Sequence, residues 1–173
     1  MIKGSAALYE DLHPIFDCDY PPTVVHNFLA QLPMRLRACA KPDAHARIVT
    51  TNYDDVLEIA FDAAHEPFDL CSYIAEGTQR GRFVHIDHDT VPQIIDKPNE
   101  YTRLSTAQRS VITKVHGSVK RRQADADADD YVITEEHYLD YLANSHAANL
   151  FPVKIVEKIR RSHILFLGYG LRD

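Results

Sequence analysis

The sequence predicts an α/β protein with a Rossmann-like, doubly wound and mostly parallel sheet. Short apolar, β-branched runs recur along the chain, and segments with helical spacing of apolar residues separate them. Near-continuous apolar runs are typical of strands covered on both faces, as in a parallel sheet with helices on either side. The alternation of strands and helices indicates the same fold class.

Three runs are the strongest strand candidates, and three others give weaker signals. The strong runs span 47–51, 111–115 and 163–167, and the weaker ones span 68–74, 83–86 and 131–133. Residues 87–110 and 119–130 show little periodicity and are expected to be long loops. The second loop joins a basic cluster, 120–122, to an acidic run, which is typical of a solvated segment.

The first two expected helices carry start signals. Thr23 is placed to cap a helix, and Pro33 is placed to open the next turn. Asp54 and Asp55 precede the second helix, where the macrodipole favours acidic groups. The face expected to be buried on the first helix comprises Val24, Val25, Phe28, Leu29 and Leu32, and that on the second comprises Val56, Leu57, Ala60 and Phe61.

Two further helices are expected in the C-terminal third. Thr134, Glu135 and Glu136 repeat the capping pattern before a stripe that we interpret as core-facing, Tyr138, Leu139, Tyr141 and Leu142. The last helix should bury Phe151, Ile155, Val156 and Ile159.

Composition narrows the class of protein. The 173 residues suit one domain, 1–173, and the net charge of −6 argues against a nucleic-acid partner. The three cysteines are odd in number and far apart, which favours neither disulfides nor a structural zinc. Because the sequence has no membrane-spanning run and no secretory signal, we expect no membrane partner and a cytoplasmic location.

Each strong strand candidate ends in small or polar residues. The three endings span 50–54, 116–118 and 168–173. Ligands of open α/β sheets bind at the carboxyl ends of the strands, so these endings should lie side by side at one edge.

The order of these endings resembles the sirtuin-like NAD-binding family, and more closely its bacterial sirtuin-like branch. That branch shows Thr-Thr-Asn-Tyr-Asp, Lys-Leu-His-Gly-Ser and Gly-Tyr-Ser-Leu-x-Asp, and here Val115 and Gly170 replace the Leu of the second motif and the Ser of the third. The resemblance spans 23–173. It also implies a Gly-Ala-Gly-x-Ser phosphate loop near the start, where this sequence has only Gly4-Ser5. We therefore expect a domain fragment, truncated at both ends, that turns over NAD weakly or not at all by itself.

The resemblance implies a reaction centre of Asn52 and His116. Asn52 can bond the ribose hydroxyls or a water, and His116 can act as general base. The residues implied in binding NAD are Thr51, Asn52, Asp54, Gly117 and Gly168. Asp54 can accept from the nicotinamide carboxamide or simply cap its helix, and Gly168 can meet the cofactor or simply form a turn.

The implied activity is an NAD glycohydrolase, with NAD as substrate and nicotinamide and ADP-ribose as products. Many domains of this branch are effectors of anti-phage defence fused to a sensor or repeat module. The alternative is a non-catalytic module that binds NAD or ADP-ribose or assembles a homo-oligomer. Protein deacylation is disfavoured because deacylating sirtuins carry a four-cysteine zinc module, and no zinc is expected here. A metal site at His85 and His88 is disfavoured because residues three apart on a strand face opposite sides.

Overall fold

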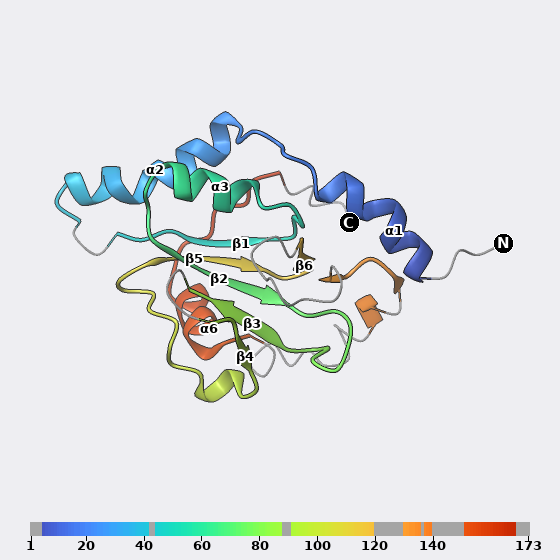
Figure 1. The fold of residues 1–173 in the computed structure, drawn as a ribbon. Helices are drawn as coiled ribbons and strands as arrows, with labels where there is room; N and C mark the ends of the chain where they lie inside the picture. The colour runs from blue at the N-terminus through green and yellow to red at the C-terminus, as the bar shows by residue number, and fades with distance from the viewer. Residues whose placement is uncertain are drawn as a thin grey trace.

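The computed structural model describes residues 5–41, 44–87, 91–119, 130–135, 137–139 and 151–168. Its main unit is a five-stranded sheet in the order β1-β5-β2-β3-β4 (Figure 1). The strands are β1 (Arg47–Thr50), β2 (Phe68–Tyr73), β3 (Phe83–Ile86), β4 (Gln93–Ile95) and β5 (Ser110–Lys114). The predicted α/β class is confirmed, and so are the strand candidates that became β1, β2, β3 and β5.

The sheet is mixed, whereas the sequence predicted a mostly parallel one. β5 pairs in parallel with both β1 and β2, but β3 pairs antiparallel with β2 and with β4. The connection from β2 to β3 is short and turns through Gly77 and Gly81, which have φ of 74° and 85°. A short connection can join only antiparallel neighbours, since a parallel pair needs a long crossover.

Helices cover both faces of this sheet (Figure 1). On one face α2 (Val24–Ala38) and α3 (Val56–Ala63) enclose a core with β5 and β2. On the other, α6 (Val153–Arg160) packs on a second core. Ile112 belongs to the first core and its neighbour Val111 to the second, because successive strand residues point to opposite faces. α6 buries Ile155 as expected, but Ile159 is exposed.

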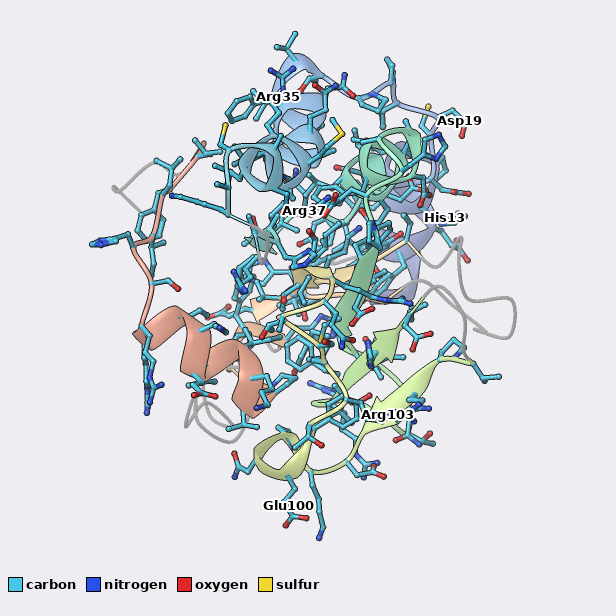
Figure 2. The ribbon with its side chains drawn as sticks, turned by 90° about the vertical axis from the view of Figure 1, so that its left-hand side faces the viewer. His13, Asp19, Arg35, Arg37, Glu100 and Arg103 are labelled. Atoms are coloured by element: carbon cyan, nitrogen blue, oxygen red, sulfur yellow. The ribbon has the colours of Figure 1, made fainter. Side chains whose placement is uncertain are left out.

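The predicted buried face of α2 is right only in part, since Leu29 packs against the first core but three of the other residues do not. Val24, Val25 and Phe28 are exposed, and the fully buried positions are Ala30 and Pro33, the latter inside a continuous helix rather than at the start of a new one. Arg37 lies on the same side of α2 as Ala30 and Pro33, seven and four residues after them. It points from α2 toward the sheet (Figure 2), and its guanidinium donates to both carboxylate oxygens of Glu66 at 2.9 and 2.5 Å.

The segment 163–167 is not a strand, although its sequence is strongly apolar. It has no sheet pairing and is exposed, with Leu165 79 % exposed. A strand forms only where a neighbouring edge offers partners for its backbone N–H and C=O groups. In the described part of the chain, β1 is the edge strand and pairs with β5 alone, and 163–167 does not pair along its outer edge.

The remaining elements lie around the sheet. α1 (Ser5–Phe16) precedes α2, and β6 (Gly117–Ser118) pairs antiparallel with β7 (Asp130–Tyr131). The expected loop 87–110 contains β4 and a 3₁₀ turn, η1 (Pro98–Glu100). The expected loop residues 120–129, Tyr141, Leu142 and the last motif from Tyr169 onward lie outside the described residues. Among the described helices, none combines the length and the apolar character needed to cross a membrane.

Candidate functional site

The strand register brings the first two predicted motifs together. Thr50 of β1 and Lys114 of β5 are Cα partners in the parallel pairing. Asn52 and His116 each follow two residues later, and the Val115 N–H donates to the Thr50 carbonyl at 3.0 Å. Both motifs therefore leave the same edge of the sheet on neighbouring strands, as the sequence predicted.

The turn after β1 presents polar groups at this edge. Thr51 and Asn52 are exposed, and the Asn52 N–H donates to the Thr50 hydroxyl oxygen at 3.1 Å. The Asp54 carboxylate accepts from the Val56 N–H at 3.1 Å, at the start of α3. This bond is of the kind weighed for Asp54 as a helix cap, although the N-cap position itself is Asp55. The other lone pairs of the Asp54 carboxylate leave room for a ligand contact.

The turn after β5 holds a half-buried imidazole. Desolvation lowers the pKa of His116 below its ordinary 6.5, so the neutral form, which can accept a proton, dominates at neutral pH. Gly117 follows with φ of 87°, a backbone conformation that disfavours any side chain. The His116 carbonyl accepts from the Val132 N–H at 2.9 Å, which fixes this turn against the segment after β7.

A buried lysine, not singled out from the sequence, ties the two turns together. Lys114 Nζ lies 2.7 Å from Oε1 of Glu58, in α3, and donates to the carbonyls of Asp54 and, at 3.4 Å, Tyr53. The Val119 N–H also donates to the Tyr53 carbonyl, at 2.9 Å. The sequence signal that could have indicated this role is a lysine at the end of an otherwise apolar strand, since lysine is seldom fully buried unless it is paired.

Aromatic rings surround these turns. The Tyr53 hydroxyl donates to the Val132 carbonyl at 2.8 Å, and burial raises the pKa of Tyr53 to about 12. The Phe16 ring of α1 packs on Tyr53 with 4.8 Å between centroids. Tyr138 was expected in the core but is 41 % exposed, with its ring 5.4 Å from that of His116. Its neighbour His137 lies 2.9 Å from Glu76, an ion-pair geometry not foreseen from the sequence.

Gly168 is not brought to this edge by a strand. It follows the exposed segment 163–167, with φ of 70° and open space where a side chain would stand. Its role in binding stays a prediction. In the described ranges no group of three metal-ligating side chains occurs. There the His85 ring lies between the Tyr101 hydroxyl, at 2.7 Å, and the Asp69 carboxylate, at 3.4 Å.

The comparison with known protein families agrees with this geometry. A family model described as a SIR2-like domain matches residues 46–173, a range that contains both turns of the site. No curated protein sequence matches the chain. Because the family match covers well over half of its length, the chain belongs to the SIR2-like domain family, whose members use NAD.

Proposed function

We propose that this domain hydrolyses NAD to nicotinamide and ADP-ribose. The observation that supports the proposal is the Thr50–Lys114 register, because the turns that follow these two residues carry an exposed amide, Asn52, and a half-buried imidazole, His116. Membership of the SIR2-like family supports NAD as the substrate. The lowered pKa of His116 supports a neutral base at neutral pH.

The reaction needs little general-acid catalysis, because the nicotinamide ring of NAD is already positively charged before it leaves. The bond between the ribose carbon and the ring nitrogen breaks, and its electron pair neutralises the ring. A water oxygen forms the new bond to the ribose carbon, and His116 takes the proton that this water loses. Asn52 orients the water or the ribose hydroxyls through its amide.

The other predicted residues would complete the binding site. Asp54 would accept a hydrogen bond from the nicotinamide carboxamide, while keeping its bond to Val56. Thr51 and Gly117 would line the same edge, and Gly168 would meet the ribose. In a cell, such turnover depletes NAD, which is the anti-phage effector behaviour that the family resemblance implies.

The test is nicotinamide release by the full-length protein. Asn52→Ala and His116→Ala should each lower the rate by about 10² to 10⁴, the range for a general base or an electrostatic stabiliser. Both residues lie in turns outside the cores, so melting temperatures should change little. Asn27→Ala and His163→Ala, at exposed positions away from both turns, are the matched controls.

Two outcomes would reject the enzyme assignment. If Asn52→Ala and His116→Ala retain parental turnover, these residues are not the reaction centre. If the parent binds NAD or ADP-ribose but releases no nicotinamide, the domain is the binding module that the sequence left as the alternative. A variant that loses activity only because it melts early would indicate a structural role instead.

A further inference from the structure

Tyr138 places an aromatic ring beside the candidate base. Its ring centroid lies 5.4 Å from that of His116, with 83° between the ring planes. In such an edge-to-face pair, each ring keeps at least one face that the other ring does not cover. Tyr138 is also 41 % exposed, so part of its surface is accessible at this edge of the sheet.

The segment that carries Tyr138 is held in place by specific bonds. The His137 N–H donates to the Thr134 hydroxyl oxygen at 3.2 Å, and the Tyr138 N–H donates to the Thr134 carbonyl at 3.1 Å. Next to Tyr138, the buried His137 ring lies 2.9 Å from the Glu76 carboxylate, just beyond β2. The first two bonds fix the conformation of the segment itself, and the third joins it to the chain that follows β2, so the position of Tyr138 is part of the fold.

We propose that Tyr138 contacts the pyridinium ring of NAD and gives the site a preference for the oxidised cofactor. This inference rests on the proposed function. There, His116 takes a proton from the water that attacks the ribose carbon bearing nicotinamide, so that ring must lie close to His116. Tyr138 is the neighbouring ring, and the face of an aromatic side chain attracts a cation within about 6 Å of its centroid. Oxidised nicotinamide carries a positive charge, whereas the reduced ring is neutral and ADP-ribose has no such ring.

The experiment compares three ligands on four proteins by calorimetric titration of the full-length protein. The ligands are a carbocyclic NAD analogue, which keeps the pyridinium but is not cleaved, reduced NAD, and ADP-ribose. The proteins are the parent, Tyr138→Ala, Tyr138→Phe and Leu139→Ala, the last an exposed neighbour on the same segment. Tyr138→Ala should weaken the analogue about 2- to 30-fold, the effect of losing one cation–π contact. ADP-ribose should bind unchanged, reduced NAD should lose less than the analogue, and Tyr138→Phe and Leu139→Ala should match the parent.

The three ligands distinguish a contact between Tyr138 and the pyridinium from a structural role of Tyr138. Equal weakening of the analogue and of ADP-ribose would show that Tyr138 only supports the fold of the site. Unchanged or tighter binding of the analogue by Tyr138→Ala would show that the ring makes no contact or obstructs the ligand. Either result overturns the inference while leaving the proposed function standing. A parent protein that binds none of the three ligands would overturn both.

Discussion

Lys114 and Glu58 form an ion pair with 2.7 Å between Nζ and Oε1, and each side chain is only 1 % exposed. The same ammonium group donates to the carbonyls of Tyr53 and Asp54. The pair therefore joins the strand that leads to His116 with the turn that contains Asn52. Removing one partner of a buried pair leaves an uncompensated charge in the interior.

Lys114→Met should lower the free energy of unfolding by about 3 to 5 kcal/mol, because Glu58 then stays buried without its cation. Adding Glu58→Gln to Lys114→Met should recover part of this loss, since the orphaned charge is gone. Urea unfolding of both single variants and the double variant measures the coupling. Lys97→Met, in the exposed pair with Glu100, is the control and should change stability by less than about 1 kcal/mol. Equal effects of Lys114→Met and Lys97→Met would contradict a buried pair.

The pH dependence of turnover should report the burial of His116. Desolvation lowers its pKa from 6.5, and the base is the neutral form, so the fall of kcat/KM on the acid side should be centred below pH 6.5. The unfolded chain binds this proton more readily than the folded one. Stability should therefore also fall as the pH drops below 6.5. Rates measured between about pH 5 and 8 test this, the range in which histidine titrates. An acid limb centred above 6.5 would be inconsistent with a desolvated imidazole.

Comparing Gly117→Ala with Gly77→Ala should show whether Gly117 affects only stability or also the rate of nicotinamide release. Gly117 and Gly77 have φ of 87° and 74°, and an alanine in this region costs roughly 1 to 2 kcal/mol. Both variants should melt earlier by similar amounts, but only Gly117→Ala should also slow nicotinamide release, because Gly117 follows His116 directly. Thermal melts and rates on the same samples decide this. Equal rates in the two variants would place Gly117 outside the site.

Ile112→Ala and Leu165→Ala should differ sharply in stability. Ile112 is fully buried in β5, and its truncation should cost about 2 to 5 kcal/mol through the cavity that it leaves. Leu165 lies in the apolar run expected to be a strand but is exposed, so its truncation should change stability by no more than about 0.5 kcal/mol. Denaturant midpoints of the two variants measure the difference. A large loss from Leu165→Ala would mean that 163–167 is buried against a partner in solution.

The sequence by itself determined the α/β class, the strands that became β1 and β5, and the emergence of the turns that carry Asn52 and His116 at one edge of the sheet. These features depend on local patterns. Apolar β-branched runs favour covered strands, and the polar residues that end two neighbouring parallel strands must emerge at one edge. The family resemblance rested on these two turns and on the last motif, 168–173, and the SIR2-like match covers all three.

Only the tertiary structure decided which surfaces meet. The run 163–167 has the composition of a strand but forms none, because pairing needs an adjacent backbone edge that composition does not specify. α2 leaves Phe28 exposed and directs Arg37 to Glu66, a partner far along the chain. The burial of Lys114 with Glu58 and the approach of Tyr138 to His116 likewise join residues distant in sequence. The periodicity of apolar residues predicts which side chains tend to be buried. The residues that they contact are determined by the packing of the whole chain.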